Sequence, residues 1–387
     1  MMRVNIFCCG RFHFHKYISY MDDKTVELVF SHKVGTLKNV DNAKNYFPKE
    51  YILYAFRKLL PARYEILAFD LAHWVWNKML FTKLVFREEV DIDHFLCHGN
   101  NAALFRSGNK SIKLAQVVNA HPVVQKGLLK KAALSIPAEY RSKYMQNQYF
   151  ELKSGGIELE AKKSDYLLAP SLFVKNSYVE QGFNGDDIYV LNYGLEKKSE
   201  VSGVKFDPLI GKKTVRILCV GLITPRKGQH LLLSALGDLR VKFPETEFII
   251  TLLGGRDQSY FNYLLTICDF EYISHLDNSE MLSFMSEYDI FVLPSFEDGF
   301  AVTVSEALSA GIPVVVSDTT GAMDIFSESS KRYSVFEHGS QASLLEKMSS
   351  IYVNGYDVEF SYGYSWEGFA ERLSDIYLDI IDRNKQL

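Results

Sequence analysis

Cysteine is scarce in this chain, and no cysteine spacing suggests a metal site or a redox pair. The five cysteines are Cys8, Cys9, Cys97, Cys219 and Cys268, an odd number without the spacing of a zinc site. Several of them lie in apolar runs, where cysteine behaves as a small buried hydrophobe. The sequence therefore indicates a reducing compartment, and we expect a cytoplasmic protein.

Long apolar runs are also absent. No stretch approaches the ~18 residues that a membrane-spanning helix needs. The chain opens on a strand-like run, residues 4–9, so no cleavable leader is visible. Repeats, low-complexity tracts and clusters of His, Cys and Asp with metal spacing are missing as well. We expect a protein that is soluble or peripheral at the inner face of a membrane and that holds no metal.

The composition suits two domains with unequal charge. At 387 residues, with 47% hydrophobic and 14% aromatic residues, the chain is long and apolar enough for two cores. Residues 1–200 carry 28 Lys and Arg against 21 Asp and Glu, whereas residues 201–387 carry 15 against 26. The basic half predicts peripheral contact with an anionic membrane, and drift in solvated surface charge is the alternative. We expect no nucleic-acid partner.

Short β-branched runs alternate with helical stretches, the pattern of parallel sheets with crossover helices. The first half predicts strands at residues 4–9, 25–30, 94–97, 115–119, 166–169 and 188–191. The second half predicts them at residues 216–220, 247–253, 271–274, 290–293 and 314–317. Helices are expected at residues 230–243, 281–287 and 303–310, among others. The fold class is therefore α/β with two Rossmann-like domains.

A polar stretch with Gly, Ser and Pro interrupts the alternation and marks the boundary between the domains. We place the first domain at residues 1–196, the linker at 197–213 and the second domain at 214–387, with the last helix packing back on the first domain. Residues 127–149 are expected to be less regular and are strongly basic.

The sharpest signal lies between residues 291 and 314. A strand ends at Pro294, a loop turns at Gly299, and a helix begins near Ala301 although its first residues are poor helix formers. Packing is therefore expected to hold this helix, and its free N–H groups suit a diphosphate. Asp298 and Glu306 lie eight residues apart and can accept hydrogen bonds from two parts of one ligand. Taken singly, each acid also fits a solvated surface position.

A second block begins with a buried strand that ends at Gly221. A turn carrying Arg226 and Lys227 follows, and then a helix. Crevices beyond the carboxyl ends of parallel strands bind ligands in such sheets, and two cations there can neutralise phosphate. A solvated basic turn is the alternative.

Together these blocks resemble the retaining, two-domain glycosyltransferases of family 4 (glycosyl transferases group 1, GT-B fold). That family has a Glu-x7-Glu motif before a Gly-x-Pro-Val strand and a Pro-(Arg/Glu)-Lys-Gly turn after the first strand of the second domain. The resemblance covers nearly the whole chain and is most specific at residues 216–317. It implies two Rossmann-like domains whose parallel sheets face a central cleft.

The resemblance also implies roles for single residues. Asp298 would hold the donor sugar, Glu306 the ribose and Lys227 the diphosphate, with Ile273 beside the nucleobase. The implied donor-binding residues are Gly10, Gly221, Arg226, Lys227, Ile273, Asp298, Gly299, Phe300, Ala301, Val302 and Glu306. Two positions depart from the family pattern: Asp298 stands in place of Glu, with Glu297 beside it, and Leu222 stands in place of Arg. The shorter acid at Asp298 implies either a change of sugar preference or a shift of the loop. Leu222 removes one phosphate contact unless Arg226 supplies it, which puts donor affinity in question but not the fold.

The first half offers weaker candidates. Gly10 follows the first strand and allows close backbone approach, and Arg11 or Lys16 can reach an anionic group. His121 matches the family histidine beside the transferred sugar, so the implied catalytic set is His121, Asp298 and Lys227. His98 and Asn100 are weak acceptor-side candidates, together with Arg11 and Lys16.

Two further patterns favour a structural interpretation. The acid pair Asp91 and Asp93 resembles the metal motif of a different, single-domain glycosyltransferase fold, but it is expected to lie ahead of a strand and to serve as a connector. The aromatic run at residues 73–81 has helical spacing and favours core packing over contact with a membrane interface.

The sequence therefore predicts retaining transfer of a sugar, of the hexosyl type, from a nucleoside diphosphate sugar to a hydroxyl of a glycan or lipid-linked acceptor. The setting implied by the family is polysaccharide or glycoconjugate biosynthesis, with the sugar nucleotide as co-substrate and no cofactor. Two alternatives remain: a sugar-nucleotide epimerase of the same fold, and a degenerate sugar-nucleotide-binding or scaffold protein.

Overall fold

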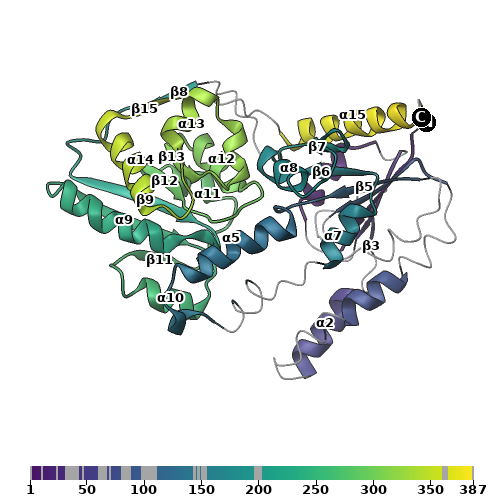
Figure 1. Cartoon of the computed structure of the whole chain (residues 1–387), viewed down its shortest axis with the longest axis horizontal. Coiled ribbons are helices and arrows are strands. Elements are labelled where there is room, and N and C mark those ends of the chain that lie inside the picture. The colour runs from purple at the N-terminus through teal and green to yellow at the C-terminus, as the bar shows by residue number, and fades with distance from the viewer. Residues whose placement is uncertain are drawn as a thin grey trace.

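The computed structural model describes residues 2–9, 12–22, 25–30, 43–45, 48–59, 68, 71–79, 89–96, 111–142, 145, 149, 155–195, 203–359 and 365–385. Within these residues two α/β bodies lie side by side (Figure 1). We call the body around the first sheet the first domain and the body around the second sheet the second domain.

The first sheet has seven strands in the order β3-β2-β1-β4-β5-β6-β7, all paired in parallel. Its strands are β1 (Val4–Cys8), β2 (Val26–Phe30), β3 (Ala43–Asn45), β4 (Ile92–Leu96), β5 (Ile112–Gln116), β6 (Tyr166–Ala169) and β7 (Ile188–Val190). Every residue of β1, β4 and β6 is buried, as expected for a parallel sheet covered by helices on both faces.

The second sheet has six parallel strands in the order β11-β10-β9-β12-β13-β14. They are β9 (Thr214–Val220), β10 (Glu247–Leu253), β11 (Glu271–Ile273), β12 (Ile290–Leu293), β13 (Val314–Ser317) and β14 (Val335–Phe336). The strand order reverses between β9 and β12, and the crevice beyond the strand ends at such a point is where α/β sheets bind ligands.

Helices cover both sheets. The longer ones are α2 (Pro48–Leu59), α5 (Pro122–Leu134), α7 (Gly155–Lys162), α8 (Leu172–Val179), α9 (Gln229–Lys242), α12 (Val302–Ser309), α14 (Gln341–Asn354) and α15 (Trp366–Lys385). The shorter ones are α1 (Phe14–Tyr17), α10 (Gln258–Leu264), α11 (Met281–Met285) and α13 (Glu328–Ser334), with 3-10 turns η1 (Ile18–Tyr20), η4 (Ala138–Tyr140), η6 (Gly185–Asp187), η7 (Pro225–Lys227) and η8 (Gly321–Ile325). Helix α5 lies between the two domains (Figure 1) and contacts η7.

The expected strands are all present, with corrections at several boundaries. Strands β4 and β5 begin earlier than predicted, because Asp93 and Lys113 lie inside them. Asp93 is therefore no connector: it is buried within β4 and accepts a hydrogen bond from Ser111 Oγ at 2.7 Å. The first part of the segment expected to be irregular is helical, because α5 continues to Leu134.

The segment predicted as a linker contains a strand of its own. Strand β8 (Gly203–Phe206) pairs antiparallel with β15 (Tyr356–Glu359). The chain crosses between the domains twice, and this pair of strands joins the two crossings. A second junction lies close by, where Leu195 bridges Ser365. A Cβ atom on Gly194 would lie 2.8 Å from the backbone of Trp366, so the close approach of the two crossings requires glycine here.

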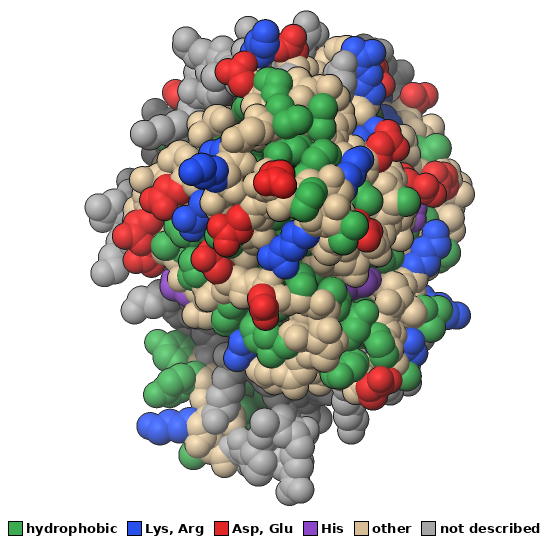
Figure 2. Space-filling model, turned by 90° about the vertical axis from the view of Figure 1, so that its left-hand side faces the viewer, with side chains coloured by type: hydrophobic (Ala, Val, Ile, Leu, Met, Phe, Trp, Pro, Cys, Tyr) green, Lys and Arg blue, Asp and Glu red, His purple; other side chains and the backbone are tan. Residues whose placement is uncertain are grey.

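Helix α15 follows the second crossing and packs on the first domain (Figure 1). Its buried residues recur at helical spacing and form one apolar face: Trp366, Phe369, Ala370, Leu373, Tyr377 and Ile380. Tyr377 Oη lies 2.7 Å from Nδ1 of the buried His94 in β4. The outer face of the second domain shows acidic and basic side chains interspersed, without a patch of one sign (Figure 2).

Candidate functional site

Two loops meet at the reversal point of the second sheet. The loop after β9 turns at Gly221 (φ 147°) and continues into η7 and Gly228 (φ 68°). A Cβ atom on Gly228 would lie 2.0 Å from the carbonyl oxygen of Pro294, in the loop after β12. Phe296 N donates to the carbonyl of Arg226 at 2.7 Å. The positive-φ glycine thus allows the two loops to contact each other through their backbones.

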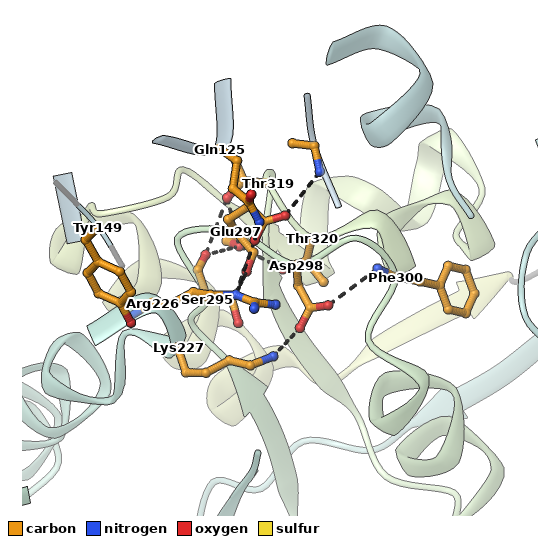
Figure 3. A network of polar contacts seen from close by, with 12 residues as sticks. Gln125, Tyr149, Arg226, Lys227, Ser295, Glu297, Asp298, Phe300, Thr319 and Thr320 are labelled. Atoms are coloured by element: carbon orange, nitrogen blue, oxygen red, sulfur yellow. Dashed lines mark hydrogen bonds and ion pairs between the residues drawn. The ribbon is translucent and has the colours of Figure 1, made fainter. Parts of the chain in front are cut away.

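Lys227 and Asp298 form an ion pair across these loops (Figure 3). Asp298 also accepts from the N–H of Phe300 at 3.4 Å through Oδ1. Burial acts to raise the pKa of Asp298, but the charges of Lys227 and Arg226 outweigh it and hold that pKa below its ordinary value. The carboxylate of Asp298 therefore stays ionised and occupies a site built from a cation and a backbone amide.

Glu297, the neighbour of Asp298, points in another direction. Its carboxylate is fully buried and lies 3.2 Å from Arg226 Nε. It also accepts hydrogen bonds from the first domain: from Ala120 N at 3.3 Å and from Gln125 Nε2 at 3.3 Å (Figure 3). The loop after β12 is thus bound to the first domain through a buried charge.

The start of α12 has no side-chain cap. Ala301 occupies the N-cap position in the left-handed conformation (φ 61°, ψ 75°), and among the described residues it is the one non-glycine with positive φ. That conformation costs an alanine about 1–2 kcal/mol. Val302 and Glu306 lie in α12 and are half-buried. An uncapped helix N-terminus next to two cations is suited to bind an anion.

His121 lies at the start of α5, and its ring packs within the first domain. Nδ1 accepts from Val123 N at 3.3 Å, and the ring centroid lies 4.9 Å from that of Tyr178 and 5.7 Å from that of Phe183. Burial lowers the pKa of His121, so the ring is neutral near pH 7. The structure therefore brings the backbone of this segment to the loop after β12 but directs the imidazole toward α8.

The remaining sequence candidates are spread around this centre. Ile273 ends β11 and is half-buried, and the side chain of Lys16 lies over Trp366 at 5.6 Å. Leu222 is 52% exposed at the loop after β9. Gly10, Arg11, His98 and Asn100 lie outside the described residues.

The structure brings together Arg226, Lys227, Asp298, Gly299 and Phe300. Sequence reasoning gave no role to Glu297, Gln125 or Ser171, and Ser171 Oγ donates to the carbonyl of Gly299 at 2.7 Å. The only available signal was the position of Glu297 beside a motif acid. Among the described residues, no group of three His, Cys, Asp or Glu is placed to hold a metal ion. No described helix is both long and apolar enough to span a bilayer.

Comparison with known proteins identifies part of the chain. Residues 204–360 match the family Glycosyl transferases group 1. D-inositol 3-phosphate glycosyltransferase of Corynebacterium efficiens is 25% identical over 209 residues, which are 50% of this chain and 49% of that protein. Glycogen synthase of Mycobacterium tuberculosis is 34% identical over 110 residues, 27% of this chain and 26% of that protein. The chain spans about half the length or less of these curated relatives.

Solved structures match over almost the full length. The apo lipopolysaccharide outer core galactosyltransferase WaaB has a TM-score of 0.57 at 16% identity, covering 99% of this chain and 100% of that one. HepE of Anabaena in complex with UDP and glucose has a TM-score of 0.58 at 13% identity, covering 97% of this chain and 99% of that one. The fold is that of GT-B glycosyltransferases, with two Rossmann-like domains.

Proposed function

We propose that this chain transfers a hexosyl group from a nucleoside diphosphate sugar to a hydroxyl of a glycan or lipid-linked acceptor, with retention at the anomeric carbon. The observation that carries the proposal is the uncapped start of α12 beside Lys227 and Arg226, at the reversal point of the second sheet. The family match over residues 204–360 supports it, as does the likeness to a fold that binds UDP and glucose in HepE.

The donor diphosphate would take the place that Asp298 holds in this structure. Its oxygens would pair with Lys227 Nζ and with the N–H groups at residues 300–302, and Arg226 would add a second positive charge. Asp298, released from Lys227, would then accept from hydroxyls of the donor sugar. Glu306 would hold the ribose and Ile273 would lie beside the base. In this proposal, two cations and the helix end supply the charge that stabilises the leaving group.

The transfer step breaks one bond and forms one. The bond between the anomeric carbon and the phosphate oxygen breaks, and the acceptor oxygen bonds to the same carbon from the same face. The acceptor's proton passes to the departing phosphate oxygen, so that charge and atoms balance. His121 enters this proposal as the residue beside the transferred sugar, which requires its ring to leave Tyr178 when the donor binds.

Two substitutions test the assignment directly. Lys227→Ala and Glu306→Ala should each lower the rate of nucleotide release from a donor panel by about 100-fold or more. Lys213→Ala is the matched control, because Lys213 is exposed and lies away from the loops after β9 and β12. Melting curves check that each variant folds. Wild-type rates in both site variants would refute the proposal.

The same assay separates the two alternatives. Tight binding of a sugar nucleotide without turnover, with acceptors present, would favour a scaffold protein. Conversion of one sugar nucleotide into its epimer without an acceptor would favour an epimerase.

We also propose that the first domain contacts an anionic membrane surface from the cytoplasmic side. Tyr51 and Tyr54 of α2 are 67% and 65% exposed and lie three residues apart, on one face of the helix, and Leu59 at its end is 77% exposed. Lys58 Nζ lies 6.0 Å from the ring centroid of Tyr54. Aromatic and lysine side chains of this kind suit the boundary between lipid headgroups and acyl chains.

The helical segment at residues 71–79 also carries an exposed aromatic side chain beside a lysine. Trp74 is 58% exposed with Lys78 Nζ 5.7 Å above its ring, whereas Trp76 is buried in the first core. The double variant Tyr51→Ser/Tyr54→Ser should lower co-sedimentation with vesicles that contain phosphatidylglycerol. Val241→Ser, at an 83% exposed position of the second domain, is the matched control. Unchanged sedimentation of the double variant would contradict this contact.

A further inference from the structure

The buried carboxylate of Glu297 has partners from both domains. From the second domain it has Arg226, whose Nε lies 3.2 Å from Oε2. From the first domain, Ala120 N donates to Oε1 and Gln125 Nε2 donates to Oε2, both at 3.3 Å. The side chain of Glu297 is fully buried, so these partners replace water.

The two groups of partners respond differently to domain motion. A buried carboxylate is costly unless it is paired and hydrogen-bonded. Arg226 stays with Glu297 when the domains separate, because both lie in the second domain. The bonds from Ala120 and Gln125 exist only while α5 and the segment before it touch the loop after β12. All partners of Glu297 are therefore present only when the two domains are in contact as in this structure, an arrangement that we call closed.

The side chain of Arg226 is oriented by its contacts with Glu297. Its Nε also donates to the carbonyl oxygen of Glu297 at 2.9 Å, which fixes the plane of the guanidinium. Figure 3 shows Arg226 and Lys227 of η7 approaching the loop after β12, with the carboxylate of Asp298 facing Lys227. The orientation of a predicted phosphate-binding cation thus depends on the residue that contacts the first domain.

The loop is also bound to the first domain on its other side. A Cβ atom on Gly299 would lie 1.9 Å from the carbonyl oxygen of Val118, and Ser171 Oγ donates to the carbonyl of Gly299. Residues 297 and 299 therefore both contact the first domain, while Asp298 between them faces Lys227.

We propose that Glu297 is a positioning residue that couples domain closure to the hold of Arg226 on the donor diphosphate, through its hydrogen bond with Gln125. This inference rests on the proposed function for the identity of the ligand. The coupling is reciprocal: the diphosphate favours the closed arrangement, and the contact between Gln125 and Glu297 favours diphosphate binding.

A charge swap tests the coupling. Gln125→Glu places two carboxylates face to face and should oppose closure, so the affinity for UDP should fall by about tenfold. The double variant Gln125→Glu/Glu297→Gln restores one carboxylate and one amide in the same contact. It should bring the affinity back to within about threefold of the wild type. Gln181→Glu makes the same change at an exposed position of the first domain and should leave the affinity unchanged.

Two measurements on the full chain give the result. Calorimetry measures UDP binding, and X-ray scattering measures the radius of gyration with and without UDP. In the wild type UDP should hold the compact form, and Gln125→Glu should stay expanded at saturating UDP. A Gln125→Glu variant that binds UDP and compacts like the wild type would overturn the proposal, and so would a double variant no better than Gln125→Glu alone.

The design separates this proposal from the proposed function. If the wild type binds UDP and transfers sugar but the double variant does not recover affinity, only the coupling is refuted. If the wild type binds no nucleoside diphosphate and turns over no donor, the transferase assignment is refuted. In that case the radii of the ligand-free wild type, Gln125→Glu and double variant still decide the contact: only an expanded single variant and a recompacted double variant agree with it.

Discussion

Helices α5 and α12 each follow a short loop after a parallel strand, yet they begin in different ways. Helix α5 starts behind His121, whose Nδ1 accepts from Val123 N, and has Pro122 at its first position, where an unpaired N–H is removed. Helix α12 starts behind Ala301, which has no side-chain acceptor and is held in a left-handed conformation. The N-cap side chain of α5 bonds to the helix, whereas the N-cap residue of α12 makes no such bond.

The two helix ends differ in how many of their backbone N–H groups are already hydrogen-bonded by a cap. A capped helix end has already satisfied part of its N–H groups and has less to offer an anion. The uncapped end of α12 lies beside Lys227, and the carboxylate of Asp298 forms an ion pair with that lysine. Under the proposed function, the strain at Ala301 and the missing cap are expected of a site that gives up stability for binding.

The largest expected effect comes from adding a side chain at Gly299, where the loop before α12 lies against the loop before α5. Gly299→Ala would place a Cβ atom 1.9 Å from the carbonyl oxygen of Val118, in the loop before α5. Because that oxygen is backbone and cannot rotate away, the domains must shift, and we expect the transfer rate to fall by roughly 100-fold. Nucleotide release from the donor measures the effect.

Gly237→Ala is the control for this change. A Cβ atom at Gly237, in α9, would meet nothing within 4 Å, and the variant should be more stable by roughly 0.5–1 kcal/mol with normal activity. Full activity in Gly299→Ala would show that the two loops do not approach this closely during turnover.

The next effect comes from giving α12 the cap that α5 already has. Ala301→Asp suits the left-handed conformation, can bond to the first N–H groups and favours the helix dipole. We expect the free energy of unfolding to rise by about 1 kcal/mol and the affinity for UDP to fall at least about tenfold, since the new charge repels phosphate. Ala301→Asn adds a similar cap without charge and should lose less affinity. Equal binding by the Asp variant would place the diphosphate elsewhere.

The third effect comes from removing the side-chain cap of α5. His121→Ala should lower the free energy of unfolding by about 1 kcal/mol, and His121→Asn should restore most of it because Asn is a good cap. If the ring also contacts the sugar, His121→Asn will recover stability but not the turnover number. Recovery of both would leave His121 a structural residue. Denaturation and steady-state kinetics on the three proteins distinguish these results.

The same residue gives a pH dependence. Burial lowers the pKa of His121 below its ordinary 6.5. A group with a depressed pKa in the folded state stabilises fully above its ordinary value, and that contribution declines as the pH falls below it. The wild type should therefore lose stability relative to His121→Asn on acidification below about pH 6.5. A constant difference between the two proteins from pH 8 to 5 would argue against this.

The smallest expected effect concerns the strain at the start of α12. Ala301→Gly relieves a left-handed conformation that costs alanine about 1–2 kcal/mol, but glycine loses about 0.5–1 kcal/mol of backbone entropy on folding. The net gain should be about 0.5 kcal/mol, visible as a small rise in melting temperature with UDP affinity unchanged. A clear loss of stability would show that the Cβ atom of Ala301 makes packing contacts that outweigh the strain.

Much of the fold could be predicted because its strands are local apolar runs bounded by turn residues. Strands β9, β10, β12 and β13 are buried and β-branched, and the predictions agree within two residues. Strands β8 and β15 were missed, since each is made by pairing with a segment about 150 residues away rather than by its own pattern. The early starts of β4 and β5 were missed because charged residues lie inside them.

For the site, local sequence order was enough to predict which charged residues follow β9 and β12, because the succession of strand, turn and helix already puts Lys227 and Asp298 at one edge of the sheet. The contacts between the domains could not be predicted in this way. Glu297 and Gln125 meet across 172 residues, and Gly299 is needed because Val118 of the other domain lies against it. Such contacts depend on how the two domains pack against each other, and no local sequence pattern specifies contacts between residues so far apart in the chain.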